Sequence, residues 1–433
     1  MAEFTEIFKI LSGTAGKVSV RGWLHHKRRT GGIQFLELRD GTGFVQCTLT
    51  RKKVDEKTFK EIDLLPVESV LEIEGTVRED PRAPQGREIE IEKITVMHQA
   101  AEDFPIAKKF HGPEFLLDKR HLWVRSKQMH HILKIRAKFL ELARKWFSDH
   151  GYTEVQMPIL TQAAVEGGST LFPVKYFDET AYLTQSWQLY AEAVISTLGK
   201  IYTVAPSFRA EKSRTRKHLT EYWHLEVEIP FAGLEELLKV EEDFLTFVIH
   251  GLAKEMAGEL KELGRDVKDL AKIKIPFPRI TYKQAVELLK KSGVKIKYGD
   301  DLGADEEKIL SSKFDVPFFL THFPKQIKAF YHKPDPKDPQ TTLSTDMEAP
   351  EGYGVELTGG GQRIDDYEEM VKRMKEEKLD PKAYEWYLDL RKYGSVPHSG
   401  FGLGVERIVM WICKLQHIRD ATAFPRLINR VYP

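Results

Sequence analysis

The stretch from residue 208 to residue 222, FRAEKSRTRKHLTEY, gathers cations where a short hydrophobic strand predicted over residues 201–205 ends. Alternation along an extended strand places Arg209 and Glu211 on one face. There a guanidinium can bind two oxygens of a phosphate or carboxylate, and a carboxylate can accept from an amine. Further cations follow in the loop, namely Lys212, Arg214, Arg216, Lys217 and His218. The stretch therefore predicts a phosphate-binding site.

A solvated hairpin tip is the alternative explanation of such a run, so the stretch alone does not decide its function. A second stretch, GLGVER at residues 402–407, lies near the C-terminus and precedes an apolar, helix-like run at residues 408–415. Together the two stretches resemble motifs 2 and 3 of the class II aminoacyl-tRNA synthetases.

Length and composition limit what the chain can be. A chain of 433 residues with 41% hydrophobic content predicts two domains with sizeable cores. A net charge of +1 means that any nucleic-acid binding depends on local basic patches. Two separated cysteines, Cys47 and Cys413, specify neither a zinc site nor a disulfide framework. With no apolar run of membrane-spanning length and no leader, we expect a cytoplasmic protein with no membrane segment.

The N-terminal part shows five short β-type runs separated by turn residues between residues 16 and 97, with one helix-like insert at residues 55–65. This pattern favours a small barrel of the oligonucleotide-binding (OB) type, although an SH3-like barrel fits nearly as well. Arg28 belongs to a basic cluster, and Phe35 and Gln46 lie on adjacent predicted strands. They are suited to stacking on a base and reading its edge; a core phenylalanine and a solvated glutamine are the alternative.

We predict an OB domain at residues 1–103, a hinge at residues 104–130 and a second domain at residues 131–433. Apolar residues recur at helical spacing from Ile132 to Phe147, and a strand and Pro158 follow. This segment resembles motif 1, which implies a homodimer interface, although an ordinary buried helix and strand would look the same. Residues 266–343 are predicted to be an insertion with its own helices and strands.

Three motif-like stretches in the family's order make the chain similar to class IIb aminoacyl-tRNA synthetases over essentially its full length. The resemblance implies an α+β protein, in which a five-stranded OB barrel precedes a catalytic domain with an antiparallel sheet flanked by helices. It also implies a two-step reaction, in which ATP activates an amino acid as the adenylate and the 3′ end of a tRNA then takes the acyl group. Neither step needs a protein nucleophile, so the site must position its substrates and stabilise charge.

The resemblance assigns an ATP site. Arg209 would hold the substrate carboxylate and the α-phosphate, Glu211 the adenine amine, and Arg407 the γ-phosphate. Tyr222 would lie against the adenine. Three residues of the loop would line the ATP tail, namely Lys217, His218 and Leu219. Close approach of the backbone to ATP would come from Gly404 and its neighbours Val405 and Glu406. Glu356 would ligate Mg²⁺, a cation suited to carboxylate oxygen. Gly359 occupies a position where some relatives supply a hydroxyl ligand, and Thr358 or water would replace it.

The resemblance also locates the amino-acid site. Aspartyl relatives carry a lysine at the position of Ala191, where it pairs with the substrate carboxylate; alanine suits the neutral amide of asparagine better. Arg363 would donate to the amide oxygen, and Glu226 would accept from the amide nitrogen directly or through water. Other predicted contacts are Gln185, Ser186, Gln188, Gly359 and, on a glycine loop, Glu166. In the barrel, Phe35 and Gln46 would read the middle anticodon base beside Arg28.

The expected function is thus activation of L-asparagine with ATP and Mg²⁺ and its transfer to tRNA(Asn) by a homodimer. The alternatives are an aspartate-tRNA ligase, including a non-discriminating one, and an asparagine synthetase-like enzyme built on the same catalytic fold. A nucleic-acid-binding module with a decayed catalytic domain is the third, and it predicts the loss of Arg209, Glu356 or Arg407.

Overall fold

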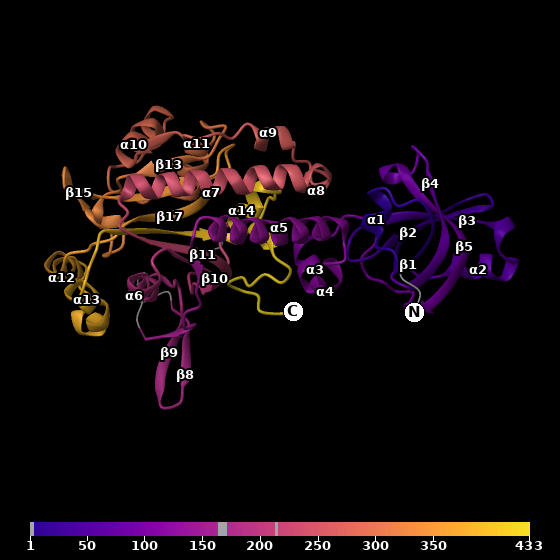
Figure 1. The fold of residues 1–433 in the computed structure, drawn as a ribbon, viewed down its shortest axis with the longest axis horizontal. Helices are drawn as coiled ribbons and strands as arrows, with labels where there is room; N and C mark the ends of the chain where they lie inside the picture. The colour runs from indigo at the N-terminus through magenta and orange to yellow at the C-terminus, as the bar shows by residue number, and fades with distance from the viewer. Residues whose placement is uncertain (1–3, 163–170, 213–214) are drawn as a thin grey trace. The chain divides into compact units, whose positions relative to one another are not determined.

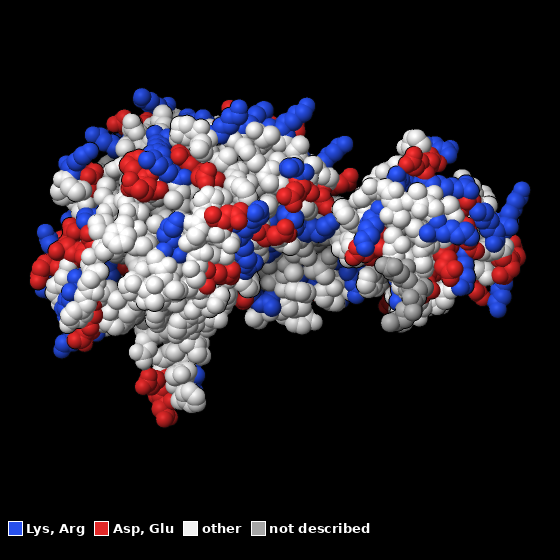
Figure 2. All heavy atoms as spheres, in the orientation of Figure 1, with Lys and Arg blue, Asp and Glu red and all other residues white. Residues whose placement is uncertain are grey.

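The computed structural model describes residues 4–162, 171–212 and 215–433 (Figure 1). The chain divides into two compact units, Met1–His111 and Gly112–Pro433. On the face seen in Figure 2, lysine and arginine side chains intermingle with aspartate and glutamate over each unit. This mixture agrees with the net charge of +1, and leaves nucleic-acid binding to local groups of residues.

The first unit is a closed five-stranded barrel, which confirms the predicted OB type. Its strands are β1 (Gly16–Thr30), β2 (Ile33–Arg39), β3 (Phe44–Thr50), β4 (Val70–Glu79) and β5 (Arg87–His98), in the order β1-β2-β3-β5-β4. Alternate residues such as Val20, Leu36 and Ile73 fill the interior. Two helices accompany the barrel, α1 (Ile7–Leu11) and α2 (Glu56–Leu64), and Asp55 caps α2 by accepting from the N–H of Thr58 at 2.9 Å.

The second unit is built on an eight-stranded sheet. Its strands in spatial order are β12 (Arg279–Thr281), β13 (Phe318–Thr321), β16 (Ser344–Glu348), β17 (Glu356–Gln362), β18 (His398–Gly404), β11 (Glu221–Pro230), β10 (Ile201–Phe208) and β6 (Thr153–Glu154). The interior pairs are antiparallel, as predicted, whereas the outermost pairs β12–β13 and β10–β6 are parallel.

One face of this sheet carries the main hydrophobic core. Helices α5 (Lys127–Asp149), α7 (Leu234–Glu255) and α14 (Val405–Ile412) lie along the sheet (Figure 1). Their buried side chains belong to this core. From the sheet, Leu225 and Val227 of β11 and Phe401 of β18 join the core. Because side chains alternate along a strand, the residues between them, including Glu226 and Glu228, lie on the opposite face. That face holds the candidate site.

A smaller hydrophobic core lies between three helices, α6 (Gln188–Leu198), α12 (Tyr367–Glu376) and α13 (Glu385–Lys392) (Figure 1). A separate three-stranded sheet consists of β7 (Leu160–Thr161), β9 (Glu179–Leu183) and β8 (Pro173–Tyr176). Further elements of this unit are α8 (Ala257–Glu262), α9 (Val267–Ala271), α10 (Tyr282–Lys291), α11 (Ala304–Ser311) and the hairpin of β14 (Pro334–Asp335) and β15 (Asp338–Thr342). In the described part of the chain, the structure has no helix with the length and hydropathy that crossing a membrane requires.

The second part of the segment predicted as a hinge, from Pro113 onward, is helical. It contains α3 (Pro113–Asp118), α4 (Arg120–Trp123) and the start of α5. Arg120 is buried and donates to the carbonyls of Arg419, Thr422 and Ala423 at 2.6–3.0 Å. The segment is therefore fastened to the C-terminal part of the chain, some 300 residues away.

Candidate active site

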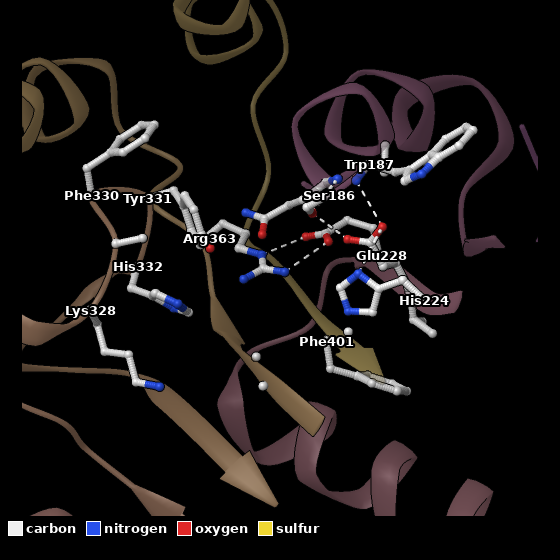
Figure 3. A pocket seen from close by; sticks show the side chains of 18 of the residues that line it. Ser186, Trp187, His224, Glu228, Lys328, Phe330, Tyr331, His332, Arg363 and Phe401 are labelled. Carbon is white, nitrogen blue, oxygen red and sulfur yellow. Dashed lines mark hydrogen bonds and ion pairs between the residues drawn. The ribbon is translucent and has the colours of Figure 1, made fainter. Parts of the chain in front are cut away.

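The open face of the large sheet forms one wall of a cavity of about 650 Å³. Strands β10, β11, β17 and β18, the start of α6 and the segment from Gln326 to His332 line it (Figure 3). Glycines on the sheet leave room for the polar side chains. A Cβ on Gly400 would clash with the carboxylate of Glu228, and one on Gly402 would clash with the ring of His224. The glycines of β18 therefore make space for the polar side chains of β11.

An arginine–glutamate pair lies at the base of the cavity. Arg363 donates through Nε and Nη2 to the two carboxylate oxygens of Glu228, at 2.9 and 3.2 Å (Figure 3). Both side chains are buried. Burial raises the pKa of Glu228, and Arg363 opposes that shift. A two-point pair of this kind fixes the orientation of both groups.

Glu226 lines the same cavity, but its oxygens are engaged at the start of α6. It accepts from the Ser186 hydroxyl and, at 2.9 Å, from the N–H of Trp187. The prediction that Glu226 receives the substrate amide stays a prediction, and the carboxylate paired with Arg363 is Glu228. The two glutamates are on the same face of β11, so alternation alone could not distinguish them.

Of the amino-acid-binding residues predicted around the start of α6, some line the cavity and others do not. Ser186, Gln188 and Ala191 line the cavity. Gln188 donates through its amide to Glu192 at 3.0 Å. Gln185 is buried but is not part of the lining. Glu166 lies outside the described residues.

A second, smaller cavity adjoins the first and gathers most of the predicted ATP residues. Its lining includes Lys217, His218, Leu219, Tyr222, Glu356, Gly404, Glu406 and Arg407. Arg209 lines both cavities, which is the place expected for a residue that binds a carboxylate and a phosphate together. β10 ends at Phe208, so Arg209 and Glu211 lie beyond the strand, but their charged groups still approach to 3.9 Å.

Two residues predicted to bind ATP make contacts within the protein itself. Val405 packs in the hydrophobic core. Glu406 binds Arg136 at 2.8 Å and accepts from the N–H of Trp223 at 3.0 Å. Burial, followed by Arg407 and Lys217, lowers the pKa of His218 to about 4, so His218 is neutral at pH 7.

Carboxylates gather where the two cavities meet. Asp346, Glu348 and Glu356 come from β16 and β17, and Glu307 comes from α11. Oε2 of Glu348 is buried without a hydrogen-bond partner in the described structure. Burial raises the pKa of Asp346 to about 7, whereas Arg407 and Lys328 outweigh burial at Glu356 and lower its pKa to about 2. Both oxygens of Asp346 accept from Lys328 at 2.7 Å, and Glu307 binds Lys217. Hard divalent cations such as Mg²⁺ prefer carboxylate oxygen, so Glu356, which stays ionised, remains the predicted metal ligand.

Thr358 is not part of that donor set. The register between β16 and β17 shifts at Met347 and Glu348, and this bulge places Thr358 on the face opposite Glu356. The Thr358 hydroxyl donates to Glu241 of α7 at 2.6 Å. The prediction that Thr358 ligates the metal is therefore corrected. Gly359 does face the cavity, where a Cβ would come within 2.7 Å of Glu356 Oε1.

In the barrel, the three predicted anticodon residues lie together across β1, β2 and β3. The Arg28 guanidinium is 4.3 Å from the ring centroid of Phe35, and its Nη2 donates to Gln46 at 3.4 Å. Gln46 donates in turn to Glu88 at 2.8 Å. Phe35 is half-buried, so one part of its ring is available for stacking.

Comparison with known proteins gives a consistent result for both units. Residues 112–428 match the model of tRNA synthetases class II (D, K and N), and residues 18–97 match that of the OB-fold nucleic acid binding domain. Asparagine–tRNA ligases from Thermococcus gammatolerans and Pyrococcus abyssi are 50% identical to the chain, with 96% of each chain covered.

Solved structures agree with the sequence matches. The asparaginyl-tRNA synthetase of Pyrococcus horikoshii, complexed with asparaginyl-adenylate, superposes with a TM-score of 0.95 at 48% identity and covers both chains fully. The aspartyl-tRNA synthetase of Entamoeba histolytica superposes with a TM-score of 0.83 at 29% identity, over 100% of this chain and 93% of its own.

Proposed function

The chain belongs to the class II tRNA synthetases of the D, K and N group, and from this membership we propose that it activates asparagine with ATP and transfers it to tRNA(Asn). The observation that carries the choice of amino acid is the Arg363–Glu228 pair beside Ala191. It offers a donor and an acceptor to a neutral amide, with no lysine at position 191 to attract a carboxylate.

Recognition of asparagine follows from the chemistry of that pair. Arg363 uses Nε and Nη2 on Glu228, and Nη1 is the guanidinium nitrogen not engaged by that carboxylate. Nη1 would donate to the amide oxygen of asparagine, and Glu228 would accept from its NH₂ group. Aspartate would bring a carboxylate against Glu228 instead, and the repulsion between buried like charges disfavours it.

Arg209 would join the two substrates. Its guanidinium lies between the amino-acid cavity and the ATP cavity, where it can hold the attacking carboxylate and the α-phosphate in line. Lys217 and Arg407 would bind the phosphate tail, and Tyr222 would stack on the adenine. Mg²⁺ held by Glu356, with Asp346 and Glu348 nearby, would neutralise phosphate charge.

The tRNA would bind through the barrel and accept the acyl group at the adenylate. Phe35 would stack on a base of the anticodon, and Arg28 and Gln46 would bind its edge or phosphate. The homodimer predicted through α5 and β6, and action in the cytoplasm, belong to the same proposal.

The test is amino-acid-dependent ATP–pyrophosphate exchange, run in parallel with asparagine and aspartate. We expect exchange with asparagine that requires Mg²⁺ and is lost in Arg209→Ala, which serves as the control for contaminating activity. Aminoacylation of tRNA(Asn) transcripts with wild-type and altered anticodons then tests the second step. Exchange with aspartate alone would contradict the assignment of the amino acid, and exchange with neither would contradict the proposed function.

A further inference from the structure

A buried carboxylate lies behind the wall of the amino-acid cavity. Glu192 of α6 does not line the cavity, and its side chain is only 1% exposed. Its Oε2 accepts from His398 Nε2 at 3.0 Å and from the Tyr387 hydroxyl at 2.7 Å, and it also binds Arg391. Its Oε1 accepts from Gln188 at 3.0 Å. Three elements, α6, α13 and β18, therefore converge on one carboxylate.

These contacts keep Glu192 ionised. Burial opposes ionisation, but Arg391 and His398 together hold the pKa of Glu192 below its ordinary range. The ring of His398 has an acceptor at each nitrogen, because Nδ1 lies 2.8 Å from the carbonyl of Val396 and Nε2 faces Glu192. Both nitrogens must donate, so His398 is an imidazolium paired with Glu192.

The partners of Glu192 also hold the backbone on both sides of Arg363. Arg391 donates through Nε to the carbonyl of Ile364 at 3.0 Å. The N–H of Arg363 donates to the carbonyl of His398 at 2.9 Å. A carboxylate oxygen of Glu192 lies within 4.8 Å of one of Glu228. Glu192 therefore acts on the Arg363–Glu228 pair both mechanically and electrostatically.

We propose that Glu192 is a positioning residue that sets amino-acid specificity: its contacts hold Arg363 in place for an amide, and its buried negative charge disfavours a substrate carboxylate. The inference rests on the proposed function, because it concerns the choice between asparagine and aspartate. Charges at this depth are little screened by salt. Removing the charge of Glu192 makes the surroundings of Arg363 and Glu228 more positive, and so favours aspartate.

The first variant is Glu192→Gln, which keeps the shape and one of the two acceptor oxygens and replaces the other by an NH₂ group. Exchange kinetics are measured with asparagine and aspartate at pH 6 and pH 8.5. At pH 6 we expect the ratio of kcat/KM for aspartate to that for asparagine to rise about tenfold or more over wild type. The rise in this ratio should be smaller at pH 8.5. The ring of His398 faces Glu192, Glu228, Arg391 and Tyr387. Once residue 192 is neutral, His398 can lose its proton at the higher pH, and the positive charge that favours aspartate is then removed.

Matched variants separate charge from packing. Glu192→Asp keeps the charge and should keep the wild-type ratio, while it raises KM for asparagine. Glu242→Gln removes a carboxylate of α7 that is equally buried but accepts from the N–H of Phe277 and from Arg279, and should leave the ratio unchanged. Equal losses for both amino acids in Glu192→Gln, with an unchanged ratio at both pH values, would overturn the proposal.

Tyr387→Phe provides the second test if Glu192→Gln does not fold. It removes one donor to Glu192 and keeps the ring, so KM for asparagine should rise severalfold and more than kcat falls. A wild-type KM in this variant would overturn the positioning role. Wild-type protein that fails to exchange with asparagine would instead refute the proposed function, so the two failures are distinguishable.

Discussion

Glu241 of α7 offers a prediction whose magnitude follows from its surroundings. The residue is fully buried behind β17. Its Oε1 accepts from the Thr358 hydroxyl at 2.6 Å, and its Oε2 has no hydrogen-bond partner in the described structure. Burial raises the pKa of Glu241 from 4.5 to about 8, against the opposing effect of Thr358. The folded protein therefore keeps Glu241 protonated at neutral pH, where the unfolded chain ionises it.

This difference lowers stability as the pH rises. Below pH 4.5 both states are protonated and Glu241 contributes no pH dependence. Between pH 4.5 and pH 8 the unfolded chain releases the proton and the folded protein does not, which costs about 1.4 kcal/mol per pH unit. The free energy of unfolding at pH 7 is thus about 3 kcal/mol lower than it would be without this ionisation. Glu241→Gln cannot ionise, has nearly the same shape and retains the oxygen that Thr358 needs.

Urea unfolding of wild type and Glu241→Gln between pH 5 and pH 8, followed by tryptophan fluorescence, measures the effect. We expect the variant to gain stability over wild type by up to about 1.4 kcal/mol for each pH unit, with a smaller slope close to pH 5 and pH 8, where the two pKa values lie nearby. A constant offset from lost or altered contacts does not affect that slope. Glu287→Gln, an exposed substitution on α10, should show no slope. A difference between Glu241→Gln and wild type that is flat with pH would refute the reasoning.

Three further outcomes follow from the site. Phe35→Ala should leave asparagine-dependent exchange intact and lower kcat/KM for tRNA at least tenfold, because stacking of a base contributes about 1–3 kcal/mol; an equal loss in exchange would contradict a role in anticodon binding. Ala191→Lys should raise KM for asparagine and increase exchange with aspartate, and the opposite preference would contradict the amide site. Glu356→Gln should reduce exchange about a hundredfold and increase the Mg²⁺ concentration needed for half-maximal rate, whereas an unchanged Mg²⁺ titration would remove Glu356 from the metal site.

The sequence was sufficient where adjacent residues carry the function. Arg209 and the loop after it, and the GLGVER stretch that ends in Arg407, are short contiguous segments, so their spacing survives folding and brings them to one cavity. The barrel was predictable for a similar reason, because alternating residues and turn signals mark each strand. Phe35 and Gln46 lie on adjacent strands β2 and β3, as the order of the runs indicates.

The sequence could not decide between neighbouring residues of similar chemistry on one strand. Glu226 and Glu228 share a face of β11, and what separates them is that Ser186 and Trp187 occupy the first and Arg363 binds the second. Thr358 was misplaced because a bulge between β16 and β17 reverses the alternation, and a bulge has no clear signature in a single strand. In both cases the deciding contact comes from another element of the fold.

The insertion at residues 266–343 shows why such distant contacts matter for function. It is more than a surface elaboration, because β12 and β13 extend the main sheet and α11 brings Glu307 to the ion pair with Lys217. Glu307 is also one of the carboxylates that, after burial, raise the pKa of Glu348 well above its ordinary range. The insertion thus adds negative charge where, among the described residues, Oε2 of Glu348 has no hydrogen-bond partner. A divalent cation at this point would relieve both conditions, since it favours ionised carboxylates and supplies the missing contact. Glu307 binds Lys217, which lines the smaller cavity, so the insertion reaches a lysine of the predicted ATP site.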